Sequence, residues 1–106
     1  MNPILVVLCT CPDETAAKEL AVGLVEQQLA ACVNVLPGIR SIYRWQGQVQ
    51  DDGEALMVIK TSGEAYPELE RWLAEQHPYE LPEVIALPLE QGLPGYLEWV
   101  AQETKR

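Results

Sequence analysis

The chain has 106 residues and contains little positive charge, one histidine and no phenylalanine. Seven Lys and Arg residues stand against 16 Asp and Glu, which gives a net charge of −9 at pH 7. Such a field repels nucleic-acid phosphates and anionic membrane surfaces, so we expect neither partner. No apolar run approaches the ~20 residues of a membrane span, and the N-terminus lacks the basic region of a secretory signal. These absences favour a cytoplasmic protein, and the length suits a single domain over residues 1–106.

Cysteine is also scarce, with Cys9, Cys11 and Cys32 only. The odd number and the missing secretory signal argue against a disulfide framework. Cys9 and Cys11 are two residues apart, so on a strand both side chains share one face and Thr10 points to the other. A C-x-C pair without a second pair is a weak metal signal. Small residues in or near a core are the alternative interpretation.

Apolar periodicity predicts alternating strands and helices along the chain. Two βαβ halves joined by a hairpin form an antiparallel sheet with both main helices on one face. We therefore predict an α+β, ferredoxin-like βαββαβ sandwich with an extra C-terminal helix. The expected strands lie at 3–10, 31–45, 55–61 and 83–92, and the expected helices lie within 11–31, at 62–77 with Ser62 as its N-cap, and within 94–106.

The hairpin between the second and third strands offers two turns. We assign the turn to Gln46-Gly47, with Pro37-Gly38 as a bend or bulge in the first arm. Asp51-Asp52-Gly53 is the rival turn. We interpret it as an irregularity in the returning strand and expect the acids within 51–54 to form a solvated loop.

This hairpin is too long for the domain. Residues 31–45 span about 50 Å at ~3.3 Å per residue, whereas a domain of this size has a radius of gyration near ~13 Å. The tip should therefore project, although it is apolar, and an exposed apolar edge invites pairing with another chain. The alternative is that Pro37-Gly38 folds the arm back over its own sheet. We predict an oligomer interface at Ile42, Tyr43, Trp45 and Val49.

Several blocks of the sequence resemble the CutA divalent-cation tolerance family. They are "LCTCPDE" (8–14), "LAACVNVLPGIRSIYRWQG" (29–47), "IKT" (59–61), "HPYELPEVIALP" (77–88) and "YLEWV" (96–100). The resemblance covers nearly the whole chain in the right order. It implies a ferredoxin-like subunit, a tight homotrimer with interlocking hairpins similar in plan to PII signalling proteins, and a cytoplasmic role in tolerance of copper and other divalent cations.

The resemblance also implies a metal site. In copper-binding members a cysteine stands at the position of Cys9, and two adjacent histidines stand where this chain has Gln76 and His77. This chain therefore has one imidazole fewer, which Cys11 could replace. In the predicted topology Cys9 and His77 lie at the same end of the sheet as the hairpin tip. We name both as candidate ligands of copper or zinc, to which Glu80 or Glu83 could add an oxygen donor.

His77 has two other interpretations. A histidine before proline at a helix end also serves as a hydrogen-bonding or capping group, and it can make assembly pH-sensitive. We expect Cys32 to lie in the core, and Lys60 to contact an anionic ligand or a neighbour's acid, or to extend to solvent.

Two functions remain open. One is a non-catalytic trimer that binds divalent metal weakly. The other is a PII-like signalling or adaptor trimer that holds a small ligand or a protein partner at inter-subunit clefts. An acylphosphatase-like enzyme is disfavoured because "LCTCPDE" offers neither an arginine nor a glycine-rich loop to bind phosphate.

Overall fold

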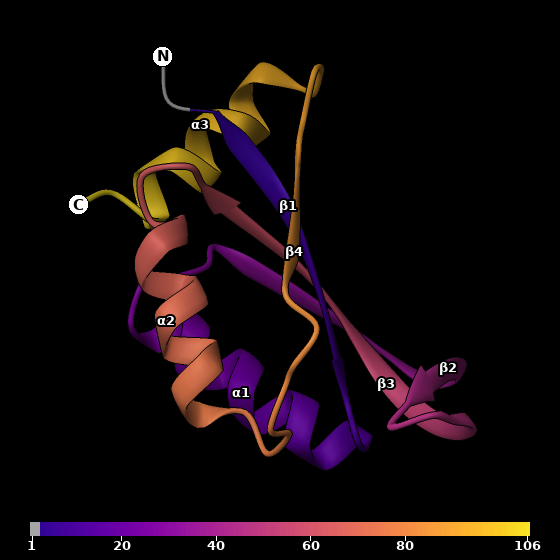
Figure 1. Cartoon of the computed structure of the whole chain (residues 1–106). Coiled ribbons are helices and arrows are strands. Elements are labelled where there is room, and N and C mark those ends of the chain that lie inside the picture. The colour runs from indigo at the N-terminus through magenta and orange to yellow at the C-terminus, as the bar shows by residue number, and fades with distance from the viewer. Residues whose placement is uncertain (1–2) are drawn as a thin grey trace.

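The computed structural model describes residues 3–106. The strands form one antiparallel sheet in the order β2-β3-β1-β4 (Figure 1). This order confirms the predicted α+β, βαββαβ plan with a C-terminal helix. The elements are β1 (Ile4–Cys11), α1 (Glu14–Glu26), β2 (Cys32–Trp45), β3 (Gln48–Ser62), α2 (Tyr66–Gln76), β4 (Ile85–Pro88) and α3 (Pro94–Glu103).

Side-chain alternation along β1 separates the two faces of the sheet. Leu5, Val7, Cys9 and Cys11 face α1 and α2 and belong to the main core. Ile4 faces the other way and packs on Val100 of α3, in a second, smaller core. The two main helices therefore cover one face, as predicted, while α3 covers only one end of the other face. The main core consists largely of Val7, Leu20, Leu24, Met57, Ile59, Leu69 and Leu73.

Two element boundaries differ from the prediction. Ser62 is the last residue of β3 and not the N-cap, which is Ala65; the Ser62 hydroxyl accepts from the Ala65 N–H (3.2 Å) in the turn before α2. The helix begins at Tyr66, with Pro67 in its first turn, where the missing N–H costs nothing. The last strand is shorter than 83–92, because Pro82 and Pro88 remove N–H donors that a longer ladder would need.

The hairpin turn was predicted correctly, but the returning strand was not. Gln46 and Gly47 have positive φ angles of 50° and 80°, as a tight two-residue turn requires. The only register shift in the pairing lies between Leu36 and Ile39, at Pro37-Gly38. The acids at 51–54 form no loop, since they continue β3 in regular register opposite residues 39–42. Cross-strand contacts hold this segment in the strand conformation. Asp51 accepts from Arg40 (2.8 Å), and Asp52 accepts from the Tyr43 hydroxyl (2.5 Å).

The far end of this hairpin, residues 39–54, forms an arm that projects from the body (Figure 1). The molecule measures 43 × 25 × 22 Å along its principal axes. Ile42 and Val49 keep 69% and 67% of their surface exposed, and Tyr43 and Trp45 are exposed as well. The apolar tip therefore does not fold back onto the core. No helix within residues 3–106 is long and apolar enough to cross a bilayer.

The contact between α1 and α2 depends on Gly23. A Cβ at this position would meet the Trp72 ring at 2.7 Å, whereas a Cβ at Gly95 in α3 would meet nothing within 4 Å. We expect Gly23→Ala to destabilise the protein by about 1–2 kcal/mol, because overpacking outweighs the gain in helix propensity. Gly95→Ala should be neutral or stabilising by up to about 1 kcal/mol. Urea unfolding of both variants tests this, and equal shifts would show that Trp72 imposes no packing limit.

Candidate functional site

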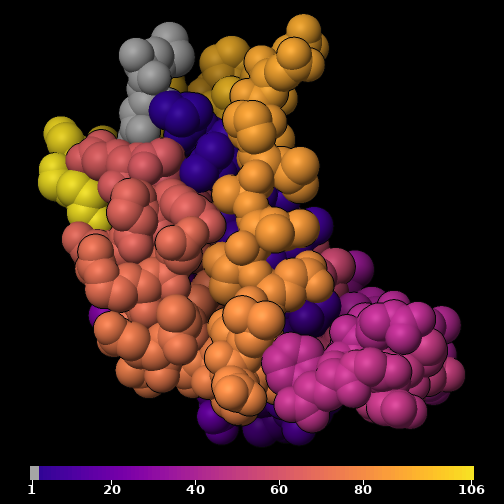
Figure 2. All heavy atoms as spheres, viewed as in Figure 1, coloured from indigo at the N-terminus to yellow at the C-terminus, as the bar shows by residue number. Residues whose placement is uncertain are grey.

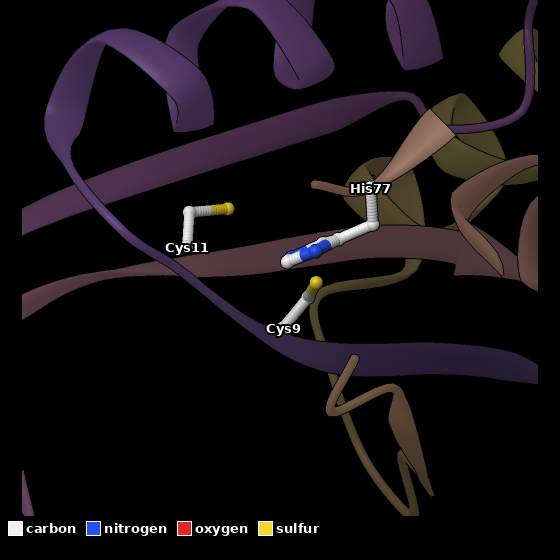
Figure 3. Close-up of side chains that lie close together, drawn as sticks. All are labelled: Cys9, Cys11 and His77. Atoms are coloured by element: carbon white, nitrogen blue, oxygen red, sulfur yellow. The ribbon is translucent and has the colours of Figure 1, made fainter. Parts of the chain in front are cut away.

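The two candidate ligands from sequence lie together, and Cys11 joins them. The Cys9 and Cys11 thiols and the His77 ring lie within 4.8 Å of one another, all buried (Figure 3). Alternation in β1 points both thiols toward the helix layer, and the end of α2 brings His77 over them. Within residues 3–106 this is the one cluster of His, Cys, Asp or Glu side chains compact enough to hold a metal ion.

The His77 ring already has two hydrogen-bond partners. Its Nδ1 accepts from the Tyr79 N–H (3.1 Å), and its Nε2 lies 2.8 Å from the Thr10 carbonyl oxygen. A carbonyl can only accept, so Nε2 carries the proton and donates. The hydrogen-bonding role expected of His77 is therefore present, although the ring bonds to a carbonyl of β1 and not to one at the helix end. A metal ion would have to replace one of these two bonds.

The two thiols differ in acidity. The pKa of Cys9 is raised, first by its hydrogen bond with Cys11 and then by burial. The same hydrogen bond lowers the pKa of Cys11. The Cys11 thiol therefore loses its proton more readily than the Cys9 thiol. Two soft sulfurs beside an imidazole are a donor set that copper or zinc accepts, so the residues present fit such an ion.

A second pair of polar side chains lies at the same end of the sheet. Glu54 is only 8% exposed, and its Oε2 accepts from the Tyr79 hydroxyl at 2.5 Å. Burial and this bond raise the pKa of Tyr79 well above its usual range. The Tyr79 ring also lies 4.8 Å, centroid to centroid, from the His77 ring. Tyr79 therefore links the histidine to β3.

A groove of about 780 Å³ opens beside this pair, between the arm and residues 78–83. Figure 2 shows the two segments side by side, the arm in magenta and the segment near residue 80 in orange. The arm contributes Ser41, Ile42, Tyr43 and Trp45, and β1 contributes Thr10. The chain's own arm therefore walls this cleft.

The other predicted site residues lie as follows. Val49 is exposed at the tip but does not line the groove, and Gln76 is exposed. Glu80 and Glu83 line the groove and are not part of the thiol cluster. Cys32 is half-buried and lies outside the core. Lys60 donates to the Asn34 side chain, a partner that the sequence did not suggest.

Sequence reasoning missed Glu54 and Tyr79. Glu54 was assigned to a solvated loop because Asp51-Asp52-Gly53 looks like a turn. Extending the two-residue alternation of "ALMVIKT" back by one step would have placed Glu54 on the face of Leu56 and Val58. Nothing in the sequence pairs Glu54 with Tyr79, 25 residues away.

Tyr79→Phe should lower the free energy of unfolding by about 1–3 kcal/mol near neutral pH, because the buried Glu54 oxygen loses its donor. The raised pKa means that this stabilisation is complete below the unfolded-state pKa of about 10 and declines as pH rises above it. The difference between wild type and variant in urea unfolding should therefore shrink above pH 10. Tyr66→Phe is the matched control, since Tyr66 donates to the exposed Glu70 at 2.7 Å. If Tyr66→Phe lowers the free energy of unfolding as much as Tyr79→Phe does, the burial of Glu54 is unimportant.

The chain is similar to known proteins along nearly its whole length. The family model described as CutA1 divalent ion tolerance protein matches residues 5–103. "Protein CutA" of Mus musculus is 54% identical over 96 residues, which cover 91% of this chain and 54% of the mouse protein. The chain thus spans about half the length of that relative. "Divalent-cation tolerance protein CutA" of Thermus thermophilus is 48% identical over 99 residues, which cover 93% of this chain and 96% of that protein.

Solved structures agree with these matches. The Thermus thermophilus Cut A1 structure has a TM-score of 0.93 at 48% identity and covers 95% of this chain and 98% of that chain. CutA1 from Oryza sativa has a TM-score of 0.93 at 45% identity, and the match covers 97% of this chain and 94% of the rice chain. Relatives are named chloroplastic in Arabidopsis thaliana and periplasmic in Archaeoglobus fulgidus, so the family is not confined to the cytoplasm. The fold, the matched blocks and these relatives agree, and the chain belongs to the CutA1 divalent ion tolerance protein family.

Proposed function

We propose that the chain acts without catalysis as a homotrimer that binds copper, or another divalent metal such as zinc, weakly. The observation that carries the metal part is the buried group of two thiols and one imidazole, whose ligand atoms lie within 4.8 Å of one another. Sulfur and imidazole donors select copper and zinc over magnesium or calcium.

The affinity should be modest for two reasons. The set has three protein donors, where a structural zinc site has four. His77 must also give up a hydrogen bond to Thr10 or to Tyr79 before a ring nitrogen can bind a metal. Cys11 supplies the third donor that Gln76, exposed on α2, does not provide.

Titration of copper and zinc against the whole chain tests the site. Cys9→Ser and His77→Ala should each weaken binding at least about tenfold, because each removes a donor. Cys32→Ser is the control, since it removes a thiol outside the cluster. Unchanged affinity in both site variants would refute metal binding at this site.

Metal binding should also depend on pH. The raised pKa of Cys9 keeps its thiol protonated near neutral pH, so a metal must displace that proton. The apparent affinity should therefore increase from pH 6 to pH 8, with proton release visible by calorimetry in two buffers of different ionisation enthalpy. Affinity that does not change over this range would mean that no thiol proton leaves.

The homotrimer is supported by apolar surface that one chain leaves exposed. Besides the arm tip, Leu36, Ile85 and Leu87 are 43%, 51% and 51% exposed. Their register opposite Leu56, Leu8 and Val6 places them on the sheet face that α1 and α2 do not cover. Sister copies packed on this face, with arms crossing between them, would bury both the arm tip and the apolar residues Leu36, Ile85 and Leu87.

Sedimentation tests the assembly. The wild type should sediment at three times its 11.8 kDa chain mass. Ile42→Glu with Val49→Glu should weaken assembly at least about a hundredfold, since two apolar side chains lose about 1.5–3 kcal/mol of burial each. Val22→Glu with Val25→Glu is the matched control, because these exposed valines lie on α1, away from both surfaces. A monomeric wild type, or equal effects in both pairs, would refute the proposed interface.

A PII-like adaptor is the second candidate function, and the groove between the arm and residues 78–83 favours it. Its volume of about 780 Å³ is in the range of small-molecule sites. A ligand-induced rise in melting temperature without any effect of metals would support this candidate over the first.

A further inference from the structure

The two thiols of the buried cluster are placed to react with each other. Cys9 and Cys11 are both fully buried, and their side chains leave β1 on the same face (Figure 3). The two thiols are also hydrogen-bonded to each other. Residues two apart on a strand have Cα atoms about 6.6 Å apart, which lies at the upper end of the range that disulfides span. The pair therefore meets the distance requirement for a disulfide within the chain.

The end of β1 gives the pair room to close. The sulfurs lie within 4.8 Å of each other, and a disulfide brings them to about 2.05 Å, so the side chains must rotate and the strand end must shift. Cys11 is the last residue of β1, where it pairs with Ala55, and residues 12–13 form a bend beyond the ladder. A strand end moves at lower cost than a strand centre, because no further ladder hydrogen bonds hold it.

Cys32 does not compete for either thiol. Val33 and Val35 of β2 pack against the main core, so alternation turns Cys32 toward the other face of the sheet. Cys32 is also absent from the thiol cluster. The one intrachain disulfide that the fold allows within residues 3–106 therefore joins Cys9 to Cys11.

The imidazole of the cluster is less available to a metal ion than the thiols are. Both ring nitrogens of His77 are hydrogen-bonded, to Tyr79 and to the Thr10 carbonyl. A copper ion that enters the cluster therefore meets two sulfurs first. Sulfur donors of this kind select Cu(I) over Cu(II). The donor set thus favours copper that has gained an electron, and the thiols are the nearest source of electrons.

We propose that Cys9 and Cys11 reduce Cu(II) to Cu(I) and are themselves oxidised to a disulfide. Two S–H bonds break and one S–S bond forms. The two electrons pass to two Cu(II) ions, one to each, and the two protons pass to solvent. The inference deepens the proposed metal function and rests on it, since it names the oxidation state of copper at the same site. The disulfide removes both sulfur donors from the cluster.

Anaerobic mixing of the fully reduced whole chain with two equivalents of Cu(II) tests the proposal. The Cu(II) signal in electron paramagnetic resonance should disappear, because both ions are reduced. Trypsin should then release residues 1–18 as a peptide lighter by two hydrogen atoms, since Lys18 is its first cleavage site and both cysteines precede it. Cys32 should still react with iodoacetamide after the chain is unfolded.

Cys32→Ser is the matched control and should reduce both Cu(II) ions at the rate of the wild type. Cys11→Ser should slow the loss of the Cu(II) signal at least about tenfold, because the remaining thiols must find partners on other chains. Its peptide of residues 1–18 should not lose two hydrogen atoms. Cys9→Ser should behave in the same way, which keeps the test decisive if one of the two variants does not fold.

A Cu(II) signal that persists in the wild type, or equal rates in the wild type and both β1 variants, would overturn the proposal. Zinc separates this result from the metal site, because zinc has no redox chemistry. If zinc binding depends on Cys9 while the Cu(II) signal persists, the metal site stands and the redox step does not. After oxidation the wild type should bind zinc no better than Cys9→Ser does, and a phosphine reductant should restore binding.

Discussion

The end of the molecule that holds both candidate sites depends on the hydrogen bond between His77 and the Thr10 carbonyl. This bond, 2.8 Å long, fastens the C-terminal end of α2 to β1. The chain then turns so that Tyr79 donates its N–H to the same ring and its hydroxyl to Glu54 of β3. One imidazole thus joins the helix layer, two strands and the segment that walls the groove. Both ring nitrogens of His77 are hydrogen-bonded, so a metal ion could bind the ring only by replacing one of these hydrogen bonds.

The two-residue alternation of β1 keeps the two sites chemically separate. Cys9 and Cys11 face the helix layer, where burial removes water from the thiols. Thr10 faces the other way and lines the groove. One site is therefore dry and rich in sulfur, and the other is open, acidic and aromatic. Because the sites lie on opposite faces of one strand, the groove and the thiol cluster share no residue.

The arm adds surface that one chain does not bury. Its cross-strand contacts, Arg40 with Asp51 and Tyr43 with Asp52, are exposed and contribute little to stability in water. The apolar tip gains burial only from another molecule, which is the physical reason to expect association. The same arm forms one wall of the groove. Assembly and ligand binding are therefore expected to influence each other through residues 41–45.

The sequence alone determined the element order, the antiparallel plan, the Gln46-Gly47 turn and the proximity of Cys9 to His77, because these follow from local periodicity and from topology. Tertiary structure decided what local pattern could not. Residues 51–54 are strand because the opposite arm offers a regular ladder, which outweighs the turn preference of Asp-Asp-Gly. Glu54 is buried because Tyr79, from a different segment, covers it. Such contacts join residues far apart in the chain, and their energy exists only once the sheet and the α2 end have met.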